Sequence, residues 1–255
     1  MPFEEEGIGY GKAKDSGPVA RLQQRIDQGQ VQLAFEPDLG FLPALLKELD
    51  IPPESQMLVF SKSSFQRERI SPQTPRALYF GDDAYIGFIP GSPMLELTSV
   101  DPQLGAVFYT LEQKPSVQPR FIRTDQCLEC HASSKTMGVP GHVIRSFQTD
   151  ETGLVNLASG ISPINHRTPL AERWGGWYVT GTHGAQIHRG NLIGPEAFAE
   201  VEALVLRMLR ENAQRRHGSL TLLRGLLLQL LGLTCPTEWE GQALLATSQD
   251  LTARA

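Results

Sequence analysis

Apolar residues near the amino terminus recur at the spacing of an α-helix. Between residues 18 and 29 they fall at Val19, Leu22 and Ile26. Pro18 precedes them in the first turn, where proline is favoured. A second apolar run over 42–49 ends before Pro52-Pro53, a pair that cannot continue a helix. The pattern predicts two amphipathic packing helices that carry no chemistry.

From Met57 onward the helical spacing of apolar residues ends, and short apolar stretches alternate with turn residues. The expected strands are 57–60, 78–80, 84–89, 95–98 and 106–111. Gly81-Asp82-Asp83 is typical of a hairpin turn, and Asp101 to Gly105 turns the chain between the last two strands. We therefore expect an antiparallel sheet over residues 57–123, with a further strand candidate at 143–147.

One short motif follows this sheet directly: Cys127-Leu128-Glu129-Cys130-His131. The spacing C-x-x-C-H is the attachment signature of c-type haem. Two thiols on one turn of chain can add to the two vinyl groups at one edge of a porphyrin. The histidine that follows is then held beneath the iron as an axial ligand.

Two other interpretations of the motif stay open. A thioredoxin-like redox pair should follow a strand and open a helix in a βαβ context, whereas here the downstream residues soon become loop-like. A structural zinc site needs four ligands, and the third cysteine, Cys235, has no partner nearby in the sequence. Zinc would therefore have to recruit dispersed histidines.

The stretch from Arg173 to Gly184 is unusual because it holds two of the three tryptophans, a tyrosine and several glycines. Broad aromatic rings with close backbone approach could line a flat cofactor. An aromatic strand that ends in a tight turn explains the same composition. Further along, apolar residues at helical spacing over 196–216 and a leucine-rich segment predict a helical pair or docking arm.

Composition narrows the class of protein. The chain has 255 residues with 24 glycines and 18 prolines, which indicates a loop-rich fold. Its net charge of −5 argues against a dedicated nucleic-acid binder. No stretch is long and apolar enough to cross a bilayer, and the acidic start Met1 to Glu6 lacks the features of a signal peptide. The expected fold class is α+β, with antiparallel hairpins in the middle, a haem-binding loop after them and helices at both ends.

Several separated motifs resemble one family. They are Ser71 to Phe80, Val100-Asp101-Pro102, Cys127 to His131 and Arg173 to Gly184. In this order they are similar to a family of exported bacterial proteins with a cytochrome c domain. The resemblance covers residues 18–192 and implies one covalent haem c, electron transfer and an exported precursor. We accordingly expect an extended segment at 1–17, a haem-binding domain at 18–192 and a helical segment at 193–255.

With haem bound, Cys127 and Cys130 would carry the thioether bonds and His131 would be the proximal ligand. For the distal ligand we favour His183, between Thr182 and Gly184, and place His188 next. Two nearer candidates, Met137 and His142, have only a short path to the opposite face of a porphyrin. Arg123 and Arg145 flank the motif and could pair with the haem propionates, although each could equally be a solvated surface charge.

Three functions follow from these interpretations. The leading one is a monohaem c-type electron-transfer protein of the periplasm or exterior, with an unknown redox partner. The second is a haem-dependent peroxidase or oxidoreductase with an open distal site, so whether the chain is an enzyme stays open. The third is a cytoplasmic non-haem thiol or metal protein. The carboxy-terminal helices could serve a homo-oligomer or a docking partner.

Overall fold

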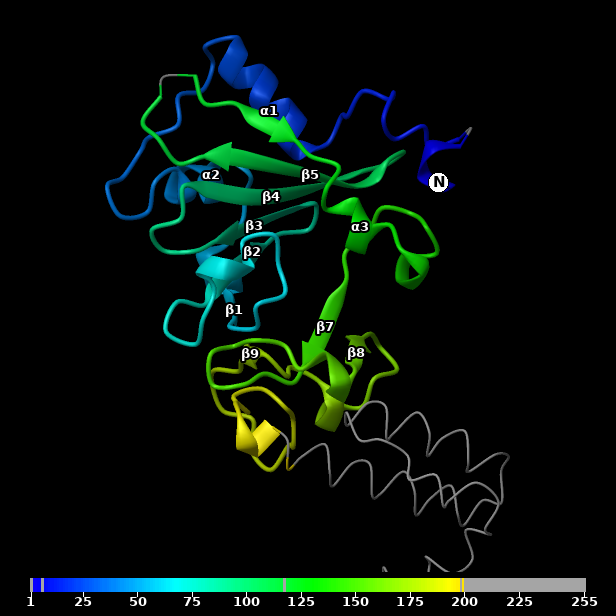
Figure 1. Cartoon of the computed structure of the whole chain (residues 1–255). Helices are drawn as coiled ribbons and strands as arrows, with labels where there is room; N and C mark the ends of the chain where they lie inside the picture. The colour runs from blue at the N-terminus through cyan, green and yellow to red at the C-terminus, as the bar shows by residue number, and fades with distance from the viewer. Residues whose placement is uncertain (1, 6, 117, 198, 200–255) are drawn as a thin grey trace, which may run out of the picture.

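The computed structural model describes residues 2–5, 7–116, 118–197 and 199, and within them the fold is built on an antiparallel sheet with few helices (Figure 1). The α+β fold class expected from the sequence is confirmed at this level. The helical segment expected in the tail is helical at residues 195–197 and 199, and residues 200–255, which include Cys235, lie outside the described residues.

Seven strands form the main sheet, in the order β6-β5-β4-β3-β2-β1-β9. They are β1 Met57–Val59, β2 Arg76–Phe80, β3 Ala84–Phe88, β4 Met94–Asp101, β5 Gly105–Glu112, β6 Phe121–Arg123 and β9 Trp177–Tyr178. From β1 to β6 each strand pairs with the next one along the chain, as expected for consecutive hairpins. The antiparallel sheet predicted over 57–123 is thus confirmed, and β9 adds an edge strand from far along the chain.

One face of this sheet carries the hydrophobic core. Along β4, burial alternates, so that Leu95 and Leu97 face inward while Glu96 and Thr98 face the opposite side. The inward side chains pack with those of α1 (Pro18–Asp27) and α2 (Leu42–Glu48). Both helices lie where the apolar spacing predicts them, because each buries its apolar stripe against the strands.

The amino-terminal segment is docked on the sheet as well. Tyr10 is fully buried, and its hydroxyl donates to the carbonyl of Ala106. The side chain of Arg123 donates to the carbonyls of Tyr10 and Ala13, and its guanidinium lies 4.2 Å from the Tyr10 ring centroid. Residues 10–13 are therefore held against the last strand before the cysteine motif.

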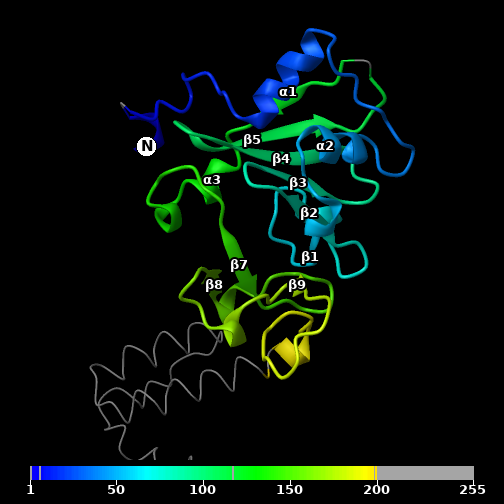
Figure 2. The same cartoon turned by 180° about the vertical axis from the view of Figure 1, so that it is seen from behind.

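A second, two-stranded sheet follows the motif. It pairs β7 (Ile144–Phe147) with β8 (Ile161–Ile164), and both views show β7 running from the short helix α3 (Leu128–His131) toward β8 and β9 (Figures 1 and 2). The described residues also contain six short 3₁₀ helices: η1 Pro2–Glu4, η2 Pro53–Ser55, η3 Arg67–Arg69, η4 Ser134–Thr136, η5 Leu157–Ser159 and η6 Leu170–Glu172.

The tryptophan-rich stretch joins the two sheets. Gly175 bonds to β7 through both its amide and its carbonyl, and the carbonyl of Gly176 accepts from Phe60 and Ser61 after β1. A Cβ on Gly175 would lie 2.4 Å from the Phe147 carbonyl oxygen, so only glycine fits there. Trp177 is buried in strand β9, so the aromatic-strand interpretation describes this stretch. None of the described helices is long and apolar enough to span a membrane.

Candidate functional site

The cysteine motif forms one helical turn directly after the main sheet. Cys127 precedes α3, and its carbonyl accepts hydrogen bonds from the amides of Cys130 and His131. Residues three and four positions apart share one side of a helix, so the two thiols and the imidazole lie on the same side. Leu128 is 6% exposed and anchors the turn in the core, whereas Cys130 is exposed.

A hydrogen bond fixes the protonation of His131. Its Nδ1 lies 2.9 Å from the carbonyl oxygen of Gly141, and a carbonyl can only accept, so Nδ1 carries the proton. Burial is the main cause that lowers the pKa of His131, with the charges of Arg145 and Arg76 acting in the same direction. The ring is therefore neutral at pH 7, and the lone pair on Nε2 has no hydrogen-bond partner within the described residues.

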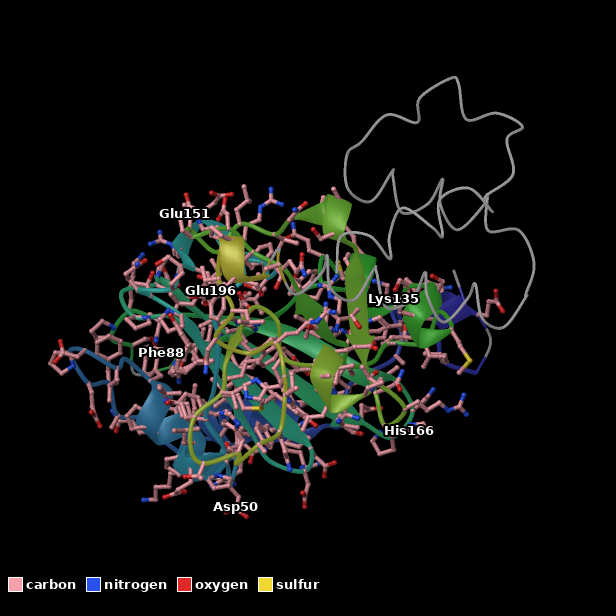
Figure 3. All side chains as sticks on the ribbon, turned by 90° about the horizontal axis from the view of Figure 1, so that it is seen from below. Asp50, Phe88, Lys135, Glu151, His166 and Glu196 are labelled. Atoms are coloured by element: carbon pink, nitrogen blue, oxygen red, sulfur yellow. The ribbon has the colours of Figure 1, made fainter. Side chains whose placement is uncertain are left out.

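The loop that follows returns to the sheet and holds that carbonyl in place. The amide of Gly141 donates to the carbonyl of His131, and the Pro140 carbonyl accepts from the amide of Ala106 on β5. The middle of the loop, with Lys135, lies at the periphery of the molecule (Figure 3). Met137 is 87% exposed, so its sulfur lies outside the cluster around His131.

Aromatic rings on the outer face of the sheet gather around the motif. The ring of Phe108 lies 4.7 Å from that of His131 and 6.5 Å from that of His142. His142 also packs on Tyr85, at 4.1 Å, although part of its surface stays exposed. Desolvation of this ring is the main cause that lowers the pKa of His142, and the charge of His131 lowers it further. The structure thus brings His131 and His142 to one aromatic cluster.

The histidine favoured as distal ligand lies elsewhere. His183 is exposed on the loop after β9, where its ring makes a T-shaped contact with His188 at 4.5 Å. His188 is held in that loop, because its Nδ1 accepts from the amide of Gly190. The structure therefore brings His183 and His188 to each other, and His142 rather than His183 to Phe108.

The two arginines that flank the motif have different surroundings. The guanidinium of Arg123 donates hydrogen bonds to the carbonyls of Tyr10 and Ala13, so this side chain holds the amino-terminal segment against the sheet. Arg145 lies on β7 with its guanidinium 5.1 Å from the Phe147 ring centroid. It forms no ion pair in the part of the chain that the structure describes, and its charge acts on His131.

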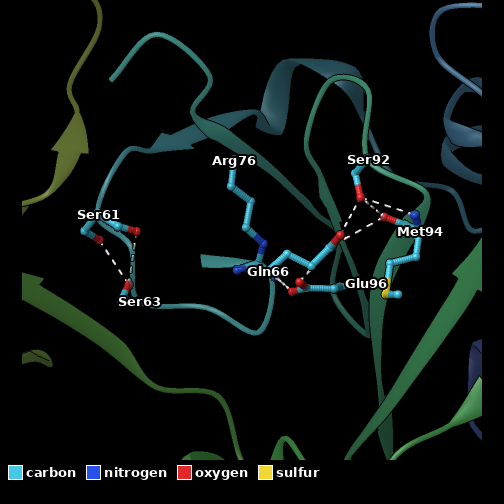
Figure 4. A network of polar contacts seen from close by, with 7 residues as sticks. All are labelled: Ser61, Ser63, Gln66, Arg76, Ser92, Met94 and Glu96. Carbon is cyan, nitrogen blue, oxygen red and sulfur yellow. Dashed lines mark hydrogen bonds and ion pairs between the residues drawn. The ribbon is translucent and has the colours of Figure 1, made fainter. Parts of the chain in front are cut away.

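A polar network lies on the same outer face and escapes sequence reasoning (Figure 4). Arg76 Nη2 lies 2.5 Å from Glu96 Oε2, and the amide of Gln66 donates to Glu96 Oε1 at 3.0 Å. The hydroxyl of Ser92 in turn donates to Gln66. The charges of Arg76 and Glu96 both act on Cys127 and His131. The sequence does place Arg76 and Glu96 in two expected strand regions, but strand pairing alone does not show which face of the sheet meets the motif.

Cys127 has the electrostatics of an unreactive thiol. Burial, together with the charge of Glu96, raises its pKa to about 11, so the thiol is protonated at neutral pH. Cysteines of redox-active C-x-x-C pairs have lowered pKa values instead, since the thiolate is the nucleophile. This observation disfavours disulfide exchange as the chemistry of the motif.

The raised pKa predicts a rate difference between the two thiols in the chain without haem. At pH 8 about one Cys127 thiol in a thousand would be ionised, so iodoacetamide should modify it roughly 100-fold more slowly than an unperturbed thiol. Peptide mass spectrometry against time can compare Cys127 with the exposed Cys130. In concentrated urea, where burial is lost, the modification rates of Cys127 and Cys130 should converge. Equal rates in the folded chain would contradict the raised pKa of Cys127.

The described residues contain no group of three or more histidine, cysteine and acidic side chains arranged to hold a metal ion. Comparison of the chain with protein-family models, with curated proteins and with solved structures finds no match.

Proposed function

We propose that the chain is a monohaem c-type cytochrome that transfers electrons through one covalently attached haem. The observation that carries the proposal is the hydrogen bond from His131 Nδ1 to the Gly141 carbonyl. Iron-ligating histidines commonly donate their other ring nitrogen to such an acceptor, which fixes the tautomer and the ring orientation. Here that bond leaves Nε2 as the ligand atom, on the same helical turn as both thiols.

The residues present fit the group. Cys127 and Cys130 would form the thioether bonds, and His131 Nε2 would bind the iron. Phe108 packs against the His131 ring and restricts its rotation, while the Gly141 carbonyl keeps its proton on Nδ1. Haem bound there would supply a one-electron couple at the iron. The resemblance to exported bacterial cytochrome c proteins supports a periplasmic or exported location.

Covalent attachment tests the proposal directly. The chain is produced with an export leader and the haem-attachment machinery, then extracted with acidified acetone and assayed as the pyridine haemochrome. One haem should stay with the polypeptide. Replacing both Cys127 and Cys130 by alanine should abolish its retention, because no thioether can form. The matched control is Cys235→Ala, which changes the one cysteine outside the motif and should keep the haem. A colourless unaltered protein would refute the proposal.

A second candidate function is a haem oxidoreductase with an open distal site. It is supported by the position of His183, which contacts His188 on an exposed loop rather than the cluster around His131. Carbon monoxide separates the two functions. A ferrous protein that binds it without displacing a ligand would favour the open site, whereas a six-coordinate spectrum lost in His183→Ala would favour the electron carrier with His183 as distal ligand.

A further inference from the structure

The guanidinium of Arg76 lies flat over a glycine on the outer face of the sheet. A Cβ on Gly87 would lie 2.5 Å from Arg76 Nη2 and 2.6 Å from its Nε. Glycine at this strand position therefore leaves the space that the guanidinium occupies. The Arg76 side chain is only 18% exposed, and that of its partner Glu96 is 14% exposed.

This guanidinium has unused donors. Nη2 pairs with Glu96, but Nε–H is buried and has no acceptor among the described residues. A buried donor without an acceptor is costly, and native proteins rarely leave one without a reason. Gln66 donates to the other carboxylate oxygen of Glu96, so the pair with Glu96 uses Nη2 and leaves Nε–H available for a further acceptor.

The unused donors lie on the face of the sheet that carries the ring packed on His131, because Glu96 is two residues from Thr98 on β4 and Thr98 pairs with Phe108. The charge of Arg76 acts on both Cys127 and His131, and that of Arg145 acts on His131. Arg145 lies over the ring of Phe147 and has no carboxylate partner within the described part of the chain. The guanidinium groups of Arg76 on β2 and Arg145 on β7 therefore both have N–H donors available to a molecule bound at the cysteine motif.

We propose that Arg76, together with Arg145, forms a carboxylate-binding subsite for the molecule that the cysteine motif holds. Arginine suits this role because its planar fork of N–H donors matches a carboxylate. The inference rests on the proposed function: for haem, the two carboxylates are its propionates. Arg123 is excluded from the subsite because its donors are used by Tyr10 and Ala13.

The test uses the protein with haem covalently attached and the variants Arg76→Gln and Arg145→Gln. The control Arg120→Gln removes the same charge from an exposed residue that pairs only loosely with Asp27, at 3.7 Å. Loss of a nearby positive charge stabilises the ferric state, so each site variant should lower the equilibrium constant for reduction by about tenfold, or 59 mV for one electron. The control should leave the midpoint potential unchanged.

A second readout separates propionate binding from a general disturbance of the sheet. The propionate bending bands of the resonance Raman spectrum respond to hydrogen bonds on these carboxylates, so they should shift in both site variants. Arg76→Lys keeps the charge but loses the fork, and it should restore the potential without restoring the bands. Site variants that match Arg120→Gln in both measurements would overturn the subsite while leaving the cytochrome intact. A colourless unaltered chain would instead refute the proposed function, and the subsite with it.

Discussion

Replacing Gly105 by alanine is expected to lower the free energy of unfolding by roughly 3 kcal/mol. Gly105 begins β5 with a φ of +73°, a conformation that L-residues adopt only at a cost. In addition, its new Cβ would lie 2.4 Å from the carbonyl oxygen of Pro140. Because that oxygen accepts from Ala106, the loop would have to move away from the sheet and lose this hydrogen bond.

Chemical denaturation measures this loss, and Gly91→Ala is its matched control. Gly91 has a φ of +71°, but a Cβ there meets nothing within 4 Å, so it isolates the conformational cost of about 1 kcal/mol. The difference between the variants then reports the contact with Pro140. Equal losses of stability in Gly105→Ala and Gly91→Ala would show that the loop holding Pro140 moves aside without a cost in free energy. With haem attached, Gly105→Ala should also alter the absorption spectrum, since Pro140 precedes the carbonyl that orients His131.

The second large effect is expected from Asp101→Asn, with a loss of about 2 kcal/mol at pH 7. The Asp101 carboxylate accepts four hydrogen bonds, from the amide and hydroxyl of Ser16 and from the amides of Gln103 and Leu104. Burial alone would raise the pKa of Asp101, but these hydrogen bonds outweigh it and lower the pKa to about 2. An asparagine would turn its NH₂ group toward two of the donors.

The lowered pKa also predicts the pH dependence. Because the folded pKa lies below the unfolded value of about 3.9, the stabilisation by Asp101 is complete above that pH and disappears as the pH falls toward 2. Unfolding curves at several pH values should therefore converge for Asp101→Asn and the unaltered chain in acid. Asp82→Asn, in an exposed turn, is the control and should change little. A constant difference down to pH 2 would contradict this account.

The main sheet was predictable because its strands are consecutive hairpins. Alternation along β4 and the turn residues before β3 and β5 are local signals, and local signals set both the pairing and the register. The edge strand β9 was not predictable, since it pairs Trp177 and Tyr178 with residues more than a hundred positions earlier. No local pattern in a two-residue strand specifies so distant a partner.

For the site, the sequence predicts the ligand types but not their surroundings. Cys127, Cys130 and His131 share one helical turn, so their proximity follows from spacing alone. The Gly141 acceptor, the rings of Phe108 and His142, and Arg76 reach the motif through the loop and the outer face of the sheet. Arg123 is close to the motif in sequence, but its guanidinium binds the amino-terminal segment and not the motif. Closeness in sequence therefore did not predict its contacts.

The contact between Arg123 and the amino-terminal segment has a consequence for the timing of folding. Its two hydrogen bonds join residues 110 and 113 positions apart in the sequence, and the hydrogen bond from the Phe121 amide to Gln23 spans 98 positions. Contacts of such long range form late, because their loop entropy must be offset by the hairpins between them. We therefore expect the edge of the sheet beside the cysteine motif to be completed late in folding.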